Sequence, residues 1–166
     1  MAQARPARSS VTLERLFDAT IDEVWELWTT AEGVEAWWGP DGFDVKVRTL
    51  DLRPGGEMTY VMTATAPDQV NFMKKAGMPL ATEARLTFTE VDPPRRLTYS
   101  HLADFIPGVE PYRVATQVDL DATGKGVRMA LTLEAMHDQE WTNRALRGWE
   151  DELDKLARIL ANGQTT

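Results

Sequence analysis

The sequence predicts an α+β domain in which an antiparallel sheet of about six to seven strands is combined with a long C-terminal helix and two short helices after the first strand. Three patterns carry this prediction. A helix-capping motif follows the first apolar run, alternating runs recur through the middle of the chain, and a long stretch of helical periodicity ends it. The chain of 166 residues is long enough for one domain with a substantial core.

The first strand is expected at Val11–Phe17, and a helix begins soon after it. Thr20 and Glu23 form a capping box, in which the threonine hydroxyl and the glutamate carboxylate satisfy free amides of the first helical turn. Apolar residues then recur with helical spacing to about Thr29, and a second group predicts another short helical turn. The first group is Ile21, Val24, Trp25 and Trp28, and the second is Val34, Trp37 and Trp38.

From Phe43 onwards the apolar period changes to two, which is typical of half-buried strands. Turn residues, as in Asp51–Gly56 and Ala122–Gly126, separate neighbouring runs and predict an antiparallel meander. Between Pro67 and Pro79 the alternation is interrupted, and we expect a short inserted helix there. The alternating runs are Phe43–Val47, Met58–Met62, Ala84–Phe88, Leu97–His101, Tyr112–Leu120 and Val127–Leu133.

The last part of the chain is predicted to be one long helix. Asp138 is a suitable N-cap, and Asn162-Gly163 is a suitable end. At 1.5 Å per residue the helix would be roughly 35 Å long. An apolar stripe with helical spacing predicts that one face docks on the sheet; it consists of Leu146, Trp149, Leu153, Leu156 and Leu160.

Composition narrows the classes of function. Apolar residues make up 43% of the chain and charged residues 27%, and no apolar run is long enough for membrane insertion. The net charge of -8, without a basic stripe, argues against nucleic acid as a partner. With no cysteine and two histidines, thiol chemistry is excluded and no metal is expected. No cofactor is expected either, since phosphate-loop and dinucleotide motifs are absent from the sequence.

The chain is predicted to form one domain between two tails. We expect residues 1–10 to be a flexible N-terminal tail, residues 11–161 to form the domain and residues 162–166 to be a C-terminal tail. The first ten residues lack the apolar stretch of a secretory signal, so a cytoplasmic location is expected. The sequence makes no prediction of the oligomeric state.

Five motifs, taken in order, resemble those of a known superfamily. They are Val24-Trp25, Trp37-Trp38-Gly39-Pro40, Asp51-Leu52-Arg53-Pro54-Gly55-Gly56, Pro93-Pro94-Arg95-Arg96-Leu97 and Gly148-Trp149. They resemble the START-like SRPBCC superfamily, and within it the bacterial homologues of the co-chaperone that activates the ninety-kilodalton heat-shock ATPase. The resemblance covers roughly Val11 to Leu160 and implies a helix-grip fold, in which a curved sheet wraps around the last helix.

This superfamily also includes polyketide cyclases and lipid binders related to the birch-pollen allergen, so one scaffold serves several activities. The gripping arrangement predicts a cavity between the sheet and the last helix, which would bind a small hydrophobic or amphipathic molecule. Inward strand positions supply a lining of aromatic and methionine side chains. The predicted ligand-binding residues are Trp38, Tyr60, Met62, Phe72, Met73, Phe88, Tyr99, His101, Tyr112, Val114, Met129, Leu131, Trp141, Ala145 and Trp149. Alternatively, these side chains fill the space themselves, because methionine adapts to irregular gaps.

His101 is the polar residue of greatest interest, because strand parity places it with Tyr99 and because Asp104 follows it at a strand end. It is interpreted as a ligand anchor, as a general base oriented by Asp104, or as a structural histidine. Ligand binding is the leading hypothesis. The alternatives are an enzyme similar to polyketide cyclases or hydrolases that uses His101, and a module that binds a chaperone.

The tryptophans are interpreted first as packing residues, because each indole buries a large apolar surface. Trp38 and Trp141 are expected at the mouth of the cavity. Gly148 interrupts the final helix at a cost of about 1 kcal/mol relative to alanine. We favour close packing against the sheet, rather than room for a ligand, as the reason for this glycine. The inserted segment around Phe72 and Met73 is either a lid over the cavity or a surface excursion.

Overall fold

The computed structural model describes residues 9–39, 42–103 and 108–163, which form seven strands and four helices. The α+β class and the two short helices after the first strand are confirmed. In chain order the elements are β1 (Ser10–Phe17), α1 (Ile21–Thr29), α2 (Ala31–Trp37), β2 (Phe43–Leu50), β3 (Glu57–Ala64), α3 (Pro67–Lys75), β4 (Ala81–Asp92), β5 (Arg96–Ala103), β6 (Tyr112–Thr123), β7 (Gly126–Glu134) and α4 (Gln139–Gly163).

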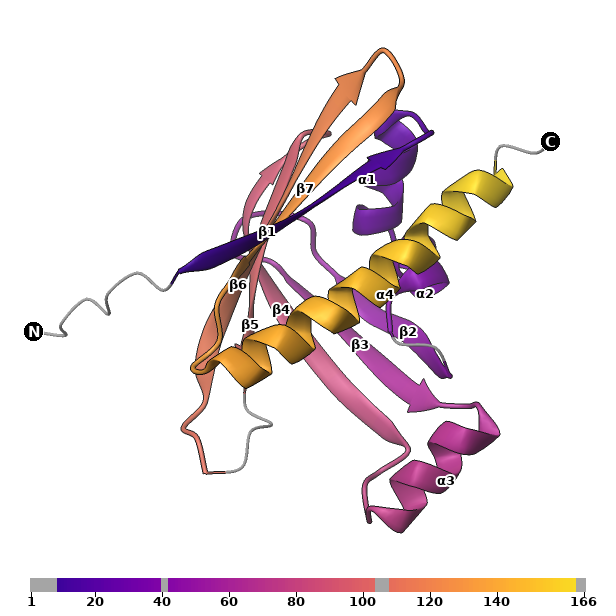
Figure 1. Ribbon diagram of the computed structural model, residues 1–166, viewed down its shortest axis with the longest axis vertical. Coiled ribbons are helices and arrows are strands. Elements are labelled where there is room, and N and C mark those ends of the chain that lie inside the picture. The colour runs from indigo at the N-terminus through magenta and orange to yellow at the C-terminus, as the bar shows by residue number, and fades with distance from the viewer. Residues whose placement is uncertain (1–8, 40–41, 104–107, 164–166) are drawn as a thin grey trace, which may run out of the picture.

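The seven strands form one antiparallel sheet in the order β1-β7-β6-β5-β4-β3-β2. Strands β2 to β7 are a meander, and β1 returns to pair with β7, with Val11 opposite Leu133. Register shifts after Val47 in β2 and after Phe88 in β4 are bulges, which bend a strand and increase its twist. Figure 1 shows the curved sheet with α4 lying across one of its faces.

The first two helices are set by threonine caps. The hydroxyl of Thr20 accepts a hydrogen bond from the Glu23 amide at 3.2 Å, and the Glu23 carboxylate accepts one from the Thr20 amide at 3.4 Å, so the predicted capping box is present. Thr30 ends α1 and caps α2, since its hydroxyl accepts a hydrogen bond from the Gly33 amide at 3.0 Å. A Cβ on Gly33 would collide with the carbonyl oxygen of Glu26. This close approach lets α1 and α2 meet at a tight corner.

The main core lies between the sheet, the α1–α2 corner and α4. Trp28 is 1% exposed, and its ring stacks on that of Trp149 from α4 with 5.8 Å between the ring centroids. It also meets Trp37 edge to face at 4.7 Å, and the Trp37 indole N–H donates a hydrogen bond to the Leu27 carbonyl at 2.7 Å. The tryptophans near the start of the chain therefore join the first two helices to the last one.

The predicted insertion between strands is helix α3. In Figure 1 this helix lies between the end of β3 and the start of β4, away from α1 and α2. Its residue Met73 is buried, whereas Phe72 is 62% exposed. Across the part of the chain that the structure describes, no helix is long and apolar enough to cross a membrane.

Candidate functional site

A pocket with a volume of about 470 Å³ lies between the sheet and α4 and is partly open to solvent. We call it the α4 pocket. Strands β3, β4 and β5, the segment after α2, one residue of α3 and one face of α4 form its wall. Aromatic and aliphatic side chains make up most of that wall, and a few polar groups interrupt it, as is typical of small-molecule sites. The lining residues are Trp38, Gly39, Tyr60, Met62, Gln69, Leu86, Tyr99, His101, Ala145, Gly148, Trp149, Asp151 and Glu152.

The spacing of these residues along each strand and helix explains why they face the pocket. Side chains two positions apart on a strand face the same side of the sheet, and side chains three or four apart on a helix share a face. The first rule puts Tyr99 and His101 of β5 on the pocket side. The second rule puts Ala145, Trp149 and Glu152 on the face of α4 that lines the pocket.

Aromatic rings in several planes form one end of the pocket. The Trp38 ring meets Tyr60 edge to face at 5.4 Å, lies 6.1 Å from Tyr99, and meets Trp149 at 6.4 Å, all between ring centroids. Trp38 itself is 8% exposed, and its indole N–H has no hydrogen-bond partner among the described residues. The wall at this end therefore presents both ring faces and ring edges to the pocket.

Glu152 places a carboxyl group in this aromatic surrounding. Its Oε1 accepts a hydrogen bond from the Gly39 amide at 3.0 Å, which ties α4 to the segment after α2. Burial raises the pKa of Glu152 to about 7, although the Gly39 hydrogen bond and the charge of Lys155 act in the opposite direction. The neighbouring Asp151 adds to the increase. Near neutral pH the group is therefore divided between acid and carboxylate.

The two tyrosines beside Glu152 stay protonated. Burial raises the pKa of Tyr60 to about 12, and the charge of Glu152 contributes. Burial also raises the pKa of Tyr99 well above its ordinary value. The interaction of Tyr99 with the Thr116 side chain on β6 acts in the opposite direction. The Tyr99 hydroxyl is completely buried, so it does not face the open space of the pocket.

Gly148 has a different role from the one predicted. A Cβ built on this residue would meet no atom within 4 Å, so the helix does not need a glycine for close packing against the sheet. The prediction of close packing is wrong, because the backbone of α4 at Gly148 stands at the exposed mouth of the α4 pocket rather than against a strand. The glycine leaves space at that mouth between Ala145 and Glu152.

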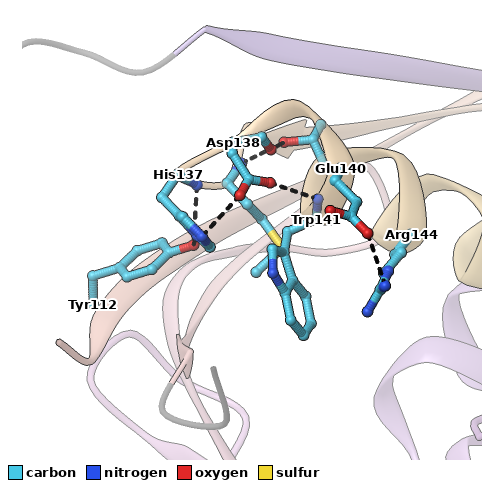
Figure 2. A network of polar contacts seen from close by, with 8 residues as sticks. Tyr112, His137, Asp138, Glu140, Trp141 and Arg144 are labelled. Atoms are coloured by element: carbon cyan, nitrogen blue, oxygen red, sulfur yellow. Dashed lines mark hydrogen bonds and ion pairs between the residues drawn. The ribbon is translucent and has the colours of Figure 1, made fainter. Parts of the chain in front are cut away.

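A second, smaller cluster lies at the start of α4. The Tyr112 hydroxyl is 2.9 Å from His137 Nδ1 and accepts a hydrogen bond from the His137 amide at 3.1 Å, while His137 Nε2 is 3.2 Å from an Asp138 carboxylate oxygen. The other Asp138 oxygen accepts a hydrogen bond from the Trp141 amide at 2.8 Å, which confirms Asp138 as the helix cap. Figure 2 shows this chain of contacts from β6 to the first turn of α4. It fastens the helix to the sheet at the end opposite the tryptophan core.

The structure divides the predicted ligand-binding residues into two groups. Seven of them line the α4 pocket: Trp38, Tyr60, Met62, Tyr99, His101, Ala145 and Trp149. The other eight lie elsewhere: Phe88, Met129 and Leu131 in the main core, Tyr112, Val114 and Trp141 in the second cluster, Met73 buried on α3 and Phe72 exposed on the same helix. Strand parity correctly selected inward residues, but the pocket occupies only part of the inward face.

Of the predicted catalytic pair His101 and Asp104, the structure describes only His101. His101 lines the pocket, opposite Leu86 on β4 and Val114 on β6. Asp104 lies outside the described residues. Within the described ranges, no group of three histidine, cysteine, aspartate or glutamate side chains is arranged to hold a metal ion.

Sequence reasoning missed the acidic residues of the pocket. The sequence patterns did not single out Glu152, because a glutamate in a charge-rich helix usually lies on the solvated face. Its position three residues after Trp149 and seven after Ala145 places it on the gripping face, and that spacing was the available signal. Gln69 carried no such signal, because it reaches the pocket from the inserted helix α3.

Comparison with known proteins gives a family match over most of the chain. Residues 18–161 match the family described as "Activator of Hsp90 ATPase homolog 1-like protein". Among curated proteins, none matches the sequence significantly.

Solved structures of several bacterial proteins share the fold. A protein from Chromobacterium violaceum is 22% identical, with a TM-score of 0.74 over 91% of this chain and 96% of its own. A protein from Arthrobacter aurescens is 22% identical, with a TM-score of 0.72 over 92% of this chain and 86% of its own. The AHSA1 protein from Silicibacter pomeroyi is 21% identical, with a TM-score of 0.72 over 94% of this chain and 100% of its own. At these identities the similarity establishes the helix-grip fold alone.

Proposed function

The chain belongs to the family of Activator of Hsp90 ATPase homolog 1-like proteins, and we propose that it uses their helix-grip fold to bind a small hydrophobic or amphipathic molecule in the α4 pocket. The observation that carries this proposal is the pocket itself. Its volume of about 470 Å³ lies within the range of small-molecule sites, and its wall combines aromatic rings with a small number of polar groups.

The apolar and the polar side chains around the pocket would contribute to binding in different ways. The rings of Trp38, Tyr60 and Trp149 would cover the apolar part of a ligand, because burial of apolar surface is the main source of affinity in such sites. His101 and Glu152 would fix its orientation through hydrogen bonds. Gly148 supports the same proposal, since a helix-destabilising residue stands at the pocket mouth where packing does not require it.

The proposal is tested by adding small hydrophobic molecules to the ¹⁵N-labelled protein and following its amide resonances. We expect localised shifts at Tyr60, His101 and Trp149, and much smaller ones at Tyr112, which belongs to the separate cluster at the start of α4. The variant Gly148→Leu should weaken binding by narrowing the mouth, with Gly148→Ala as the matched control. A lack of localised shifts with every class of hydrophobic molecule would argue against the proposal.

General acid–base catalysis is a second candidate, and the observation in its favour is that Glu152 and His101 line one pocket. A carboxyl group with a pKa of about 7 suits proton transfer near neutral pH. Under this hypothesis His101→Ala and Glu152→Gln would both abolish turnover and leave the fold intact. Full turnover of an identified substrate by either variant would remove that residue from the mechanism.

Binding to a chaperone is a third candidate, and it is favoured by the family description alone. Under this hypothesis the protein would act beside the heat-shock ATPase, and the cytoplasmic location expected from the sequence would suit that role. Co-purification with the ATPase from the same organism, together with an increase in its ATP hydrolysis rate, is the expected result. An unchanged hydrolysis rate at saturating concentrations of this protein would count against it.

A further inference from the structure

The fixed charges on the wall of the α4 pocket are all negative. Asp151 and Glu152 line it from α4, and no lysine or arginine does so among the described residues. Lys155 acts on Glu152 from the next turn of the helix but does not line the pocket. The whole chain is also acidic, with a net charge of -8. The electrostatic potential in the pocket therefore favours a cation over an anion.

Glu152 lacks a counter-ion in this surrounding. Its hydrogen bond comes from the neutral amide of Gly39 at 3.0 Å, and no described lysine, arginine or histidine nitrogen lies within 4.0 Å of its carboxylate. Removal from water makes an unpaired carboxylate costly, which is why its pKa rises to about 7. A positively charged ligand group would remove this cost by supplying the missing partner.

The rings around Glu152 are suited to the same kind of group. The Trp38 ring lies 5.4 Å from that of Tyr60, at an interplanar angle of 86°, and 6.4 Å from that of Trp149, at an angle of 82°. The three rings therefore enclose the space from different directions. The faces of aromatic rings attract cations, and tryptophan does so most strongly.

We propose that the α4 pocket binds a cationic amphiphile, with the positively charged head held by Glu152 among the rings and the apolar part lying along Met62 and Leu86. This inference rests on the proposed ligand-binding function and specifies the chemical class of the ligand. A carboxylate such as a fatty acid would meet Asp151 and Glu152 without a balancing cation. A neutral alcohol would leave the Glu152 carboxylate unpaired.

Three probes with eight carbon atoms each test the proposal: octylammonium, 1-octanol and octanoate. Their dissociation constants are measured by calorimetry, and their place of binding is identified from amide shifts at Tyr60, His101 and Trp149. We expect octylammonium to bind at least about tenfold more tightly than the other two at pH 8, which corresponds to the gain from one desolvated ion pair with aromatic neighbours.

The pH dependence gives a second readout. For a carboxyl with a pKa of about 7, the ionised fraction rises from about 0.1 at pH 6 to about 0.9 at pH 8, so octylammonium affinity should rise about tenfold. The titratable groups around Glu152 are Asp151 and Lys155 on α4, Tyr60 on β3, and Tyr99 and His101 on β5. Of these, histidine is the other type that ordinarily titrates between pH 6 and 8.

The variant Glu152→Gln shows whether Glu152 or His101 causes the pH dependence of binding. It keeps an oxygen that can accept the Gly39 hydrogen bond but removes the charge, so octylammonium affinity should fall about tenfold at pH 8 and lose its pH dependence, while 1-octanol affinity stays unchanged. Glu150→Gln, at an exposed position of α4 outside the pocket lining, is the matched control and should behave like the wild type.

The outcomes distinguish the two levels of the proposal. If none of the three probes shifts the pocket amides, the ligand-binding function itself fails. If 1-octanol or octanoate binds in the pocket at least as tightly as octylammonium, ligand binding stands and the cationic class is overturned. A pH dependence that persists in Glu152→Gln would also overturn it, because His101 would then be responsible.

Discussion

The substitution Glu152→Gln in the ligand-free protein tests whether the buried Glu152 carboxylate lowers the free energy of unfolding. Burial raises the pKa of Glu152 from 4.5 to about 7, and this difference corresponds to an upper limit of about 3 kcal/mol against the ionised form in the native state. The side chain is partly accessible through the pocket, and solvent screening reduces the expected effect to about 1–2 kcal/mol. Because the folded protein holds this proton more tightly than the unfolded chain, the group favours the native state at low pH. Its contribution decreases as pH rises from about 4.5 through 7.

We therefore expect Glu152→Gln to be more stable than the wild type at pH 8.5 by about 1–2 kcal/mol, with the difference becoming small near pH 5. Urea denaturation followed by tryptophan fluorescence at pH 5, 7 and 8.5 measures the free energy of unfolding. Glu150→Gln serves as the control, because its side chain is exposed on the same helix. Parallel stability curves for Glu152→Gln and the wild type across this pH range would refute the reasoning.

Three further predictions concern the packing of α4 and of the tryptophan core. Gly148→Ala should raise the free energy of unfolding by about 1 kcal/mol in urea denaturation, since the added methyl meets no atom within 4 Å, and a loss of stability would mean that the backbone there is constrained. Tyr112→Phe removes both hydrogen bonds to His137, so it should cost about 1–2 kcal/mol and speed amide exchange in the first turn of α4; unchanged exchange would show that this contact does not hold the helix. Trp28→Ala should cost about 3–5 kcal/mol because its ring is fully buried against three other tryptophans. Trp25 is only half-buried, so Trp25→Ala should cost clearly less, and equal thermal unfolding of the two variants would contradict this order.

Most of the fold could be predicted because its signals are local. The capping box at Thr20 and Glu23 fixes where α1 starts, since its hydrogen bonds join residues three apart in the chain. Strands were recognisable from their alternation, and turn residues between them indicated antiparallel pairing. The insertion at Pro67–Lys75 was recognisable as well, because proline begins the helix and the alternation of the neighbouring strands stops there.

The α4 pocket was predicted less completely, because it depends on how far each inward side chain reaches. Tyr99 and Met129 both point inwards, yet Tyr99 lines the pocket and Met129 is fully enclosed in the core. Strand parity cannot separate them, since it gives the face of the sheet and not the height at which α4 crosses it. Trp141 was expected at the pocket mouth, but it packs in the second cluster, where the guanidinium carbon of Arg144 lies 4.9 Å from its ring centroid.

The sequence by itself determined the element order and the aromatic character of the gripping face, because periodicity and capping depend on neighbours in the chain. Its resemblance to the START-like superfamily implied the helix-grip scaffold. Only the tertiary structure decided which of those side chains meet around an open space. The same holds for Gly148, which stands at a pocket mouth rather than against a strand, and for Glu152, whose partner Gly39 is 113 positions away in the chain. The pKa of Glu152 depends on desolvation by residues from several elements, and no local pattern in the sequence records that environment.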